Sequence, residues 1–401
     1  MSRKKILFFS HAVTMAHFTR PLKWIECLDL NEYDVTFATS STFKNLIPKS
    51  RVKFVEIKCI DPILFSKIVD KANPIYDRQT FAEHILEDLQ VIEDIKPDLV
   101  IGDFRHSLSV SCRVSKIKYI NMTNAYWSPE IKFSHPMPEA PIIRWLGEKL
   151  FKSTLTLMTP LILRINFFKM TFLLRRSLAP LKLKFRDYRR LIIDGDLTVF
   201  CDTPDMIPLK KKLANEIFVG PLTWSMPTPL PAWWDSLNPN KPQIFVTMGS
   251  SGDISLMPMI LTALSKLDVE VVVALSGKKI DLSSFPNVHL ADFLPIESVL
   301  KNCSLVICNG GSPMSHLALS FGVPTIGIVS NNDQVLNMAH VEDRGAGLML
   351  RYWNVTEEML LKSVHRILSS DSFRTKSQAI QKEFSLFNVP NILRNIVRDN
   401  V

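Results

Sequence analysis

The sequence predicts an α/β fold made of two domains, each built around a parallel sheet. Three observations lead to this prediction. Apolar runs that suit buried strands alternate with segments of helical periodicity along the chain. Several of these runs are continuously apolar, as is typical of parallel strands that helices cover on both faces. At 401 residues, the chain is also longer than one hydrophobic core usually serves.

The first half of the chain contains six apolar runs that suit strands. The run at residues 5–11, KILFFSH, has only four consecutive apolar residues, which is shorter than the core of a signal peptide. We therefore interpret it as the first strand. The other runs lie at residues 33–40, 53–58, 98–103, 118–123 and 197–202. Between them, residues 78–95 carry apolar side chains at helical spacing, at Phe81, Ile85, Leu89 and Ile92.

The second half contains five more runs, at residues 243–249, 269–277, 288–293, 304–310 and 324–330. The two halves are separated by residues 221–242, which include six prolines. Because proline can neither donate to a strand ladder nor continue a helix, we interpret this segment as a linker. The predicted domains are therefore residues 1–220 and residues 243–379.

The positive charge of the chain is concentrated in residues 141–190. The whole chain has a net charge of +9, and this segment alone holds twelve Lys or Arg and two acidic residues among many apolar ones. Arg164, Lys169 and Pro160 interrupt it, so it does not fit a transmembrane helix. Peripheral contact with an anionic membrane is one interpretation, and helices with a solvated basic face are the other. Nucleic acid binding is not favoured, because Gly-aromatic motifs are missing.

The six cysteines indicate a reducing compartment. They form no Cys-x-x-Cys pair and no metal-ligand spacing. We therefore expect reduced thiols and a cytoplasmic protein, peripheral to the inner face of the membrane if residues 141–190 bind lipid. We also expect no metal site, since no Asp-x-Asp motif lies near the glycine-rich turns described next.

A glycine-rich turn follows the apolar run of the fourth strand of the second half. Asn309, Gly310 and Gly311 turn the chain, Ser312 is predicted to cap a helix, and Pro313 suits its first position. Glycines allow a ligand to approach the backbone closely, and a helix N-terminus supplies free N–H groups and a positive dipole. The turn therefore predicts a phosphate site.

Two more loops are expected beside this turn. Gly249 and Ser250 follow the run that starts at residue 243, and Asp333 and Gln334 follow the run at residues 324–330. The carboxyl ends of parallel strands meet at one edge of a sheet, where ligands bind. Carboxylate and amide groups can hydrogen-bond sugar hydroxyls, so the loops together predict a nucleotide-sugar site.

The segment at residues 293–350, from FLPIESVLKNCSLVICNGGSPMSH to DRGAGLML, resembles the donor-binding signature of nucleotide-diphospho-sugar glycosyltransferases of the UDP-glycosyltransferase type. The stretches ILFFSHAVTMAHFTRPL, KPDLVIGDF and PAWWDSL fit as well, so the resemblance spans most of the chain. It implies a bacterial-like member with the GT-B fold, in which the parallel sheets of two Rossmann-like domains face across a cleft. The acceptor would bind the first domain and the donor the second. The helix at about residues 380–401 would pack back on the first domain.

The resemblance also assigns catalytic roles. His17, in Ala16-His17-Phe18-Thr19-Arg20-Pro21, stands where the family carries its catalytic base, and Asp103 stands where a carboxylate orients that base. A histidine can take the proton of an attacking hydroxyl, and a carboxylate fixes its tautomer. Direct attack inverts the anomeric centre. His11 is the other candidate base, and an Asx turn is the alternative role of Asp103.

Ten residues are expected to bind the donor: Gly249, Ser250, Phe293, Asn309, Gly310, Gly311, Ser312, Ser315, Asp333 and Gln334. By resemblance, Phe293 stacks on the nucleobase; the alternative is core packing. The chain departs from the family at Asn309, where a histidine is usual, and at Met314 with its preceding proline. Asparagine donates a hydrogen bond but no positive charge. The backbone amides and the helix dipole remain, so binding is still expected.

We therefore expect an inverting, metal-independent hexosyltransferase. It would move a sugar from UDP-glucose, or from another UDP- or dTDP-sugar, to a hydroxyl of a hydrophobic small-molecule or lipid-like acceptor. The nucleotide sugar is the co-substrate, and no cofactor is expected. Loops at residues 61–80 and 125–180 would shape the acceptor pocket. The alternatives are a nucleotide-sugar epimerase of the same fold and a non-catalytic protein that binds sugar nucleotides or a membrane surface.

Overall fold

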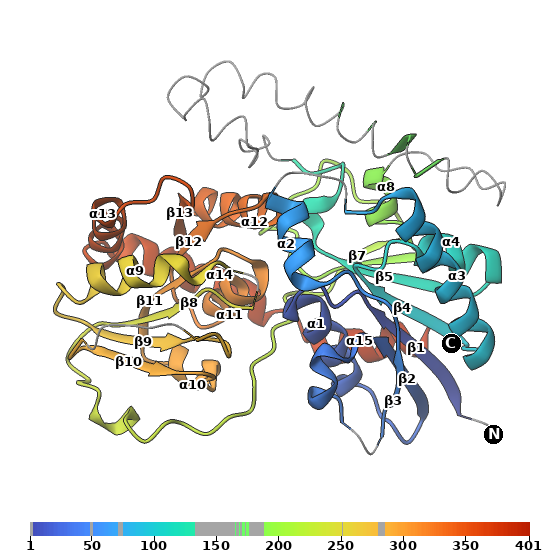
Figure 1. Cartoon of the computed structure of the whole chain (residues 1–401), viewed down its shortest axis with the longest axis horizontal. Helices are drawn as coiled ribbons and strands as arrows, with labels where there is room; N and C mark the ends of the chain where they lie inside the picture. The colour runs from blue at the N-terminus through green and yellow to red at the C-terminus, as the bar shows by residue number, and fades with distance from the viewer. Residues whose placement is uncertain are drawn as a thin grey trace. The chain divides into compact units, whose positions relative to one another are not determined.

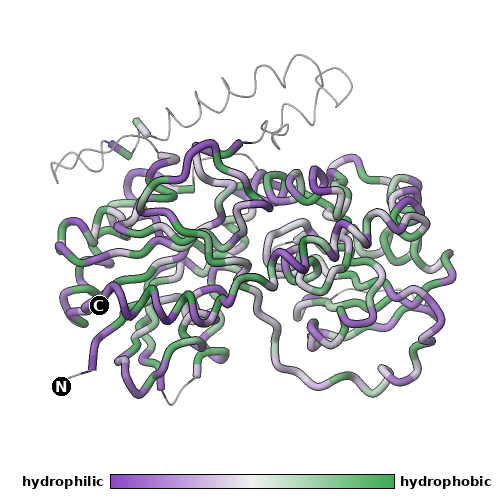
Figure 2. Tube along the Cα trace, turned by 180° about the vertical axis from the view of Figure 1, so that it is seen from behind, coloured by the Kyte–Doolittle hydropathy of each residue, from purple (hydrophilic) through white to green (hydrophobic). Residues whose placement is uncertain are grey.

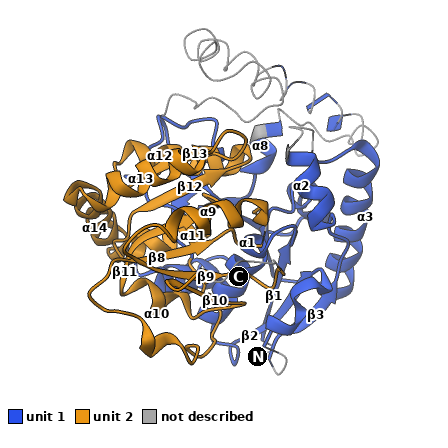
Figure 3. Ribbon diagram, turned by 60° about the vertical axis from the view of Figure 1, so that its left-hand side comes forward, with its two compact units in different colours: residues 1–222, 387–401 blue, residues 223–386 orange. Residues whose placement is uncertain are grey.

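The structure is a computed structural model of the chain. It describes residues 3–48, 51–70, 75–132, 188–250, 252–279 and 285–401, together with 165, 168, 171, 172, 174 and 175. The chain divides into two compact units. Unit 1 comprises residues 1–222 and 387–401, and unit 2 comprises residues 223–386 (Figure 3). Most of the basic segment at 141–190 and of the expected acceptor loop at 125–180 lies outside the described residues, as do positions 71–74 of the loop at 61–80.

The described strands of unit 1 form a seven-stranded parallel sheet in the order β3-β2-β1-β4-β5-β6-β7 (Figure 1). They are β1 (Lys4–Ser10), β2 (Tyr33–Thr39), β3 (Lys53–Glu56), β4 (Leu99–Asp103), β5 (Tyr119–Thr123), β6 (Leu197–Phe200) and β7 (Glu216–Phe218). Each of the six predicted runs corresponds to one strand. β7 was not predicted, because three residues are too few to show a periodicity.

Helices cover both faces of this sheet because its strands carry apolar side chains on both sides. On one face, Leu7 and Phe9 of β1 pack against Val91 of α3. On the other, Phe8 meets Trp24 of α1, with ring centroids 6.2 Å apart. The described helices of unit 1 are α1 (Met15–Cys27), α2 (Pro62–Asp70), α3 (Arg78–Ile95), α4 (Leu108–Ser115), α8 (Tyr188–Ile192) and α15 (Val389–Arg398). The helix predicted at residues 78–95 is confirmed as α3.

The described strands of unit 2 form a six-stranded parallel sheet in the order β10-β9-β8-β11-β12-β13. They are β8 (Gln243–Thr247), β9 (Glu270–Ala274), β10 (Val288–Ala291), β11 (Cys303–Cys308), β12 (Thr325–Val329) and β13 (Gly347–Arg351). The five predicted runs correspond to β8–β12, whereas β13 was not predicted. The prediction of two α/β domains with parallel sheets is confirmed.

Helices also cover both faces of the unit 2 sheet. Ile244 and Val246 of β8 join one apolar cluster with α9 and α13, while Phe245 joins another with Leu317 of α11. Figure 2 shows hydrophobic stretches, in green, in the interior of each unit. The described helices are α9 (Met257–Leu264), α10 (Ile296–Leu300), α11 (Ser312–Ser320), α12 (Asn332–Asp343), α13 (Glu357–Leu368) and α14 (Asp371–Ser385). Among the described residues of the chain, no helix is long and apolar enough to cross a membrane.

The units divide at residues 222/223 and 386/387, whereas the predicted boundaries lie at 220, 243 and about 380. The proline-rich segment belongs to unit 2 because Trp233 Nε1 donates to the Leu290 carbonyl and Ser225 Oγ accepts from the Ile296 amide. α14 stays with unit 2, where Arg344 pairs with Glu383. Only the last helix, α15, packs with α1 in unit 1, through the bond from Arg394 to the Cys27 carbonyl.

Unit 1 also buries histidines beside the ends of β1 and β4. His11, His84 and His106 each pack a ring against Tyr76. Burial lowers the pKa of His84 and of His106 to about 3, and lowers the pKa of His11 well below its usual range. These imidazoles are therefore neutral at physiological pH.

These buried histidines predict acid sensitivity. Between pH 6.5 and pH 3 the unfolded histidines bind protons that the buried ones do not, so the free energy of unfolding falls as the pH is lowered through this window. Each histidine contributes a slope of about 1.4 kcal/mol per pH unit. We expect His84→Gln to lower the slope of the free energy of unfolding against pH by one such contribution, as measured by urea unfolding at several pH values. The exposed control His365→Gln should keep the wild-type slope. Equal slopes in both variants would contradict the prediction.

Candidate active site

The structure brings His17 and Asp103 together at the carboxyl edge of the unit 1 sheet. His17 lies in the first turn of α1, and Asp103 is the last residue of β4, which pairs with Ser10 of β1. His17 Nδ1 is 2.8 Å from Asp103 Oδ1. A proton on Nδ1 is donated to this carboxylate, although the same nitrogen also lies 2.9 Å from a terminal nitrogen of Arg20, which can only donate. The other ring nitrogen, Nε2, is then left as the basic atom.

Pro21 shapes the helix that carries His17. Proline has no N–H to donate to the carbonyl four residues earlier, which is that of His17. The hydroxyl of Ser10, at the end of β1, donates to this carbonyl instead, at 2.7 Å. The Ser10 bond therefore ties the backbone of His17 directly to the edge of the sheet.

Phe104 covers one face of the His17 ring. Their ring centroids are 4.1 Å apart, and the rings are nearly parallel, at 16°. Phe104 has a φ of 57°, in the left-handed region that non-glycine residues rarely occupy. Strain of this kind costs about 1–3 kcal/mol and gathers at functional sites. Here it accompanies a backbone turn that leaves the Phe104 ring stacked on the imidazole.

His11, the other candidate base, is engaged elsewhere. Its Nδ1 is 2.7 Å from the hydroxyl of Tyr76, and its Nε2 accepts from the Ile60 amide at 2.9 Å. The side chain is fully buried. The geometry therefore favours His17 over His11 as the base.

In unit 2, the glycine-rich turn faces the loop that follows β8. A Cβ placed on Gly249 would lie 3.9 Å from Asn309 Nδ2. Gly310 has a φ of 79°, and a Cβ there would lie 2.8 Å from side-chain carbons of Met338 and Val329. Only glycine fits that position. Ser250, also predicted, lies in the same loop after β8.

The helix after the turn starts differently from the prediction. Gly311 is the N-cap of α11, whereas Ser312 was predicted. The side chain of Asn309 explains the shift, because its Oδ1 accepts from the Gly311 N–H at 3.3 Å in an Asx turn. Ser312 is buried at the first helical position, and Ser315 Oγ donates to the Gly311 carbonyl at 3.1 Å. Ser315 therefore supports the turn from beneath.

Asn337 is a site residue that the sequence analysis missed. It is fully buried on α12, and its Nδ2 donates to the Gly310 carbonyl and to Ser315 Oγ, both at 2.8 Å. These bonds fix the orientation of the peptide between Gly310 and Gly311. A polar residue among the buried apolar residues of one helix was the available signal.

Asp333 and Gln334 lie in the first turn of α12. The helix is capped by Asn331, whose Oδ1 accepts from the Gln334 N–H at 3.1 Å. Gln334 is buried, and its Oε1 accepts from the Ser330 N–H at 2.8 Å. The carboxamide oxygen of Gln334 is thus used within the loop, while Asp333 remains half-buried.

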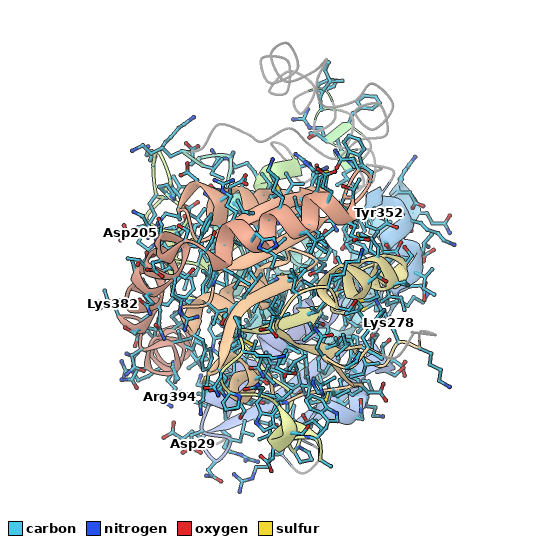
Figure 4. All side chains as sticks on the ribbon, turned by 90° about the vertical axis from the view of Figure 1, so that its left-hand side faces the viewer. Asp29, Asp205, Lys278, Tyr352, Lys382 and Arg394 are labelled. Carbon is cyan, nitrogen blue, oxygen red and sulfur yellow. The ribbon has the colours of Figure 1, made fainter. Side chains whose placement is uncertain are left out.

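Phe293 lies beside Gly277, and the next residue, Lys278, is a second one that the sequence analysis missed. The Phe293 side chain is 39% exposed, which does not fit core packing, and a Cβ on Gly277 would lie 3.4 Å from its ring. Lys278 Nζ donates to the Gly252 carbonyl in the loop after β8. Burial lowers the pKa of Lys278, although Asp253 opposes this effect. Figure 4 labels Lys278 in unit 2, on the same side of the view as Tyr352.

Unit 2 therefore gathers the predicted donor residues at the carboxyl edge of its sheet, and Lys278 adds a positive charge that the sequence analysis assigned to no residue. Among the residues that the structure describes, no group of three His, Cys, Asp or Glu side chains is placed to hold a metal ion.

The chain is similar to known glycosyltransferases. Residues 258–395 match the family described as erythromycin biosynthesis protein CIII-like, C-terminal domain. A PGL/p-HBAD biosynthesis glycosyltransferase of Mycobacterium tuberculosis is 35% identical over 95% of this chain and 89% of its own length. A PGL/p-HBAD biosynthesis rhamnosyltransferase of Mycobacterium bovis is 35% identical over 99% of this chain and 88% of its own.

Solved structures are similar in fold. The spinosyn forosaminyltransferase SpnP has a TM-score of 0.67 at 20% identity and covers 99% of this chain and 98% of its own. The glycotransferase of kitacinnamycin has a TM-score of 0.71 at 17% identity over 100% of both chains.

The geometry of unit 2 predicts which residues support nucleotide binding. We expect Asn337→Ala and Lys278→Met each to weaken the binding of UDP about tenfold in calorimetric titration, because the turn loses its anchor or the site loses its cation. Asn302→Ala and Lys279→Met are matched controls at exposed positions and should bind as the wild type does. Unchanged binding in both test variants would contradict this account of the site.

Proposed function

Because the chain belongs to the bacterial-type GT-B glycosyltransferases, we propose that it is an inverting enzyme. It moves a hexose from a nucleoside-diphosphate sugar to a hydroxyl of a hydrophobic acceptor. The observation that carries this proposal is the contact of 2.8 Å between His17 Nδ1 and Asp103 Oδ1. In the proposal, Nδ1 donates to this carboxylate and Nε2 is the base. The epimerase and non-catalytic alternatives are not favoured, because relatives that cover nearly the whole chain are named glycosyltransferases.

In the proposed mechanism, His17 Nε2 accepts the proton of the acceptor hydroxyl as its oxygen attacks the anomeric carbon. The carboxylate of Asp103 stabilises the imidazolium that forms and holds the ring in its orientation. A single displacement inverts the anomeric centre. The 17% exposure of the His17 side chain leaves the base accessible in unit 1.

The leaving group is a nucleoside diphosphate, whose negative charge grows in the transition state. In the proposal, unit 2 stabilises this charge with the backbone N–H groups of the glycine-rich turn, the N-terminus of α11 and the ammonium group of Lys278. Asp333 contacts the hydroxyls of the sugar, and Phe293 stacks on the base. This arrangement needs no bound metal.

UDP-glucose is the donor that we propose first, and dTDP-sugars are the other class. The names of two similar proteins bear on the choice. One relative is a rhamnosyltransferase, and one structural neighbour, VinC, was solved in complex with DTDP. Since these names describe other proteins, the donor is decided by direct comparison of UDP- and dTDP-sugars.

The transfer assay tests the proposed function. The protein is incubated with UDP-glucose, UDP-GlcNAc or dTDP-glucose and with long-chain alcohols and alkylphenols, and products are identified by mass spectrometry and by the anomeric NMR coupling. We expect one donor to give an inverted product. His17→Ala should lower kcat at least about 100-fold without weakening donor binding, because only the base is lost. Asp333→Ala should weaken binding of the sugar nucleotide more than binding of the free nucleotide.

Three outcomes would contradict the proposal: retention of anomeric configuration, wild-type turnover by His17→Ala, or conversion of the donor into another nucleotide sugar without any acceptor product. The last outcome would instead support an epimerase. His365→Ala, at an exposed position in unit 2, serves as the control for loss of a histidine.

We also propose peripheral contact with an anionic membrane, which suits a lipid-like acceptor. The basic segment at residues 141–190 supports it by sequence. Ile63 and Leu64 of α2, which are 67% and 53% exposed among the described residues, support it as well. We expect the protein to sediment with phosphatidylglycerol vesicles at low salt and to be released as salt screens the charges, but not to bind phosphatidylcholine vesicles. Equal binding to both kinds of vesicle would contradict the electrostatic part of the proposal.

A further inference from the structure

Arg20 is a buried cation that touches both His17 and Asp103. It lies on α1 one turn after His17 and is only 6% exposed. Its Nε is 2.8 Å from Asp103 Oδ2, and one terminal nitrogen is 3.0 Å from Asp103 Oδ1. The same terminal nitrogen lies 2.9 Å from His17 Nδ1. The carboxylate of Asp103 is therefore shared between an arginine and the histidine.

The other end of the guanidinium is held by the neighbouring strands. Its second terminal nitrogen donates to Asn124 Oδ1 at 2.7 Å, directly after β5. Asn124 Nδ2 in turn donates to Asp202 Oδ1 at 3.1 Å, after β6. All of these side chains are buried. Arg20 thus contacts groups at the ends of β4 and β5, and Asn124 links it to a third strand end at Asp202.

Among the described residues, opposite charges face His17 from β4 and from α1. Asp103 from β4 contributes a negative charge and Arg20 from α1 a positive one. His106 and His11, two titratable groups of the described residues that also interact with His17, are neutral because burial lowers their pKa values, that of His106 to about 3. The first turn of a helix is also an unfavourable place for a cation. A proton on His17 would therefore add a net positive charge at a side chain that is only 17% exposed.

We propose that Arg20 is a positioning residue that keeps His17 unprotonated and ready to act as a base. It does so by holding the carboxylate of Asp103 and by balancing its charge. This inference rests on the proposed role of His17. Without Arg20, Asp103 would face His17 alone, and the imidazolium would form at a higher pH. A base that is already protonated cannot accept the proton of the acceptor.

A purely structural role for Arg20 predicts something else. If the arginine only filled space and satisfied Asp103 and Asn124, its replacement would lower stability or activity equally at every pH. The proposal predicts instead that the pH at which the His17 imidazole gains its second proton changes. The protonation state of His17 therefore separates the two roles, and it can be observed without knowing the acceptor.

The experiment follows the imidazole nitrogens of His17 by long-range ¹H–¹⁵N NMR of histidine-labelled full-length protein from pH 5 to pH 9. The His17→Gln variant assigns the signals. In wild type we expect the Nδ1–H tautomer at neutral pH. In Arg20→Gln the change to the doubly protonated form should move up by about one pH unit, because one nearby unit charge is removed. Arg20→Lys, which keeps the charge, should restore most of the wild-type response.

Two further variants complete the test. Arg113→Gln removes a cation of unit 1 from an exposed pair with Asp194 and should leave the His17 signals unchanged. In an Asp103→Asn background the negative charge of Asp103 is absent, and Arg20 acts on His17 alone. Adding Arg20→Gln should then raise the pH at which His17 becomes doubly protonated, compared with Asp103→Asn. This double variant contains no unpaired buried charge from the pair, so it gives a readout if Arg20→Gln alone does not fold.

The outcomes are separable from those of the transfer assay. If the pH at which His17 becomes doubly protonated is unchanged in Arg20→Gln, or in the double variant relative to Asp103→Asn, the role of Arg20 is overturned. The transferase proposal would remain intact. Wild-type transfer by His17→Ala would overturn the proposed base, even if Arg20 still moved the protonation of His17.

Discussion

The organisation of unit 1 depends on a carboxylate that has no contact with solvent. Asp103 stands at the end of β4 with 0% exposure, and an uncompensated charge there would cost several kcal/mol. Arg20 and His17 contact it from α1, and Asn124 continues the network from Arg20 to Asp202. The need to compensate one buried charge therefore brings the ends of β4, β5 and β6 and the start of α1 into one arrangement.

The glycine-rich turn of unit 2 is organised around exposed backbone groups rather than around a buried charge. Gly310 leaves no room for a side chain between Met338 and Val329, and Asn337 holds its carbonyl from below. Asn309 stands where the family that the chain resembles usually has a histidine. Its side chain forms an Asx turn with Gly311. Lys278, on another loop, brings an amino group to the same edge of the sheet, where its Nζ donates to the Gly252 carbonyl.

The comparisons and the geometry answer different parts of the question of function. Identity of 35% over nearly the whole chain shows that the protein is a glycosyltransferase. The solved structures, at 20% identity or less, show the GT-B fold alone. The roles of individual side chains rest on the contacts described above. Those contacts support a base in unit 1 and an anion site in unit 2.

The sequence by itself determined the fold class, the strands except for β7 and β13, helix α3, and the candidate pair of His17 and Asp103. Periodicity and turn residues are local properties, and a resemblance transfers motif positions. Only the tertiary structure decided that His11 is engaged by Tyr76 and Ile60, that Gly311 caps α11, and that Arg20, Asn337 and Lys278 belong to the sites. These features depend on contacts between residues far apart in the chain, such as Arg20 with Asp103 and Asn124, and no local pattern encodes which buried charges will meet.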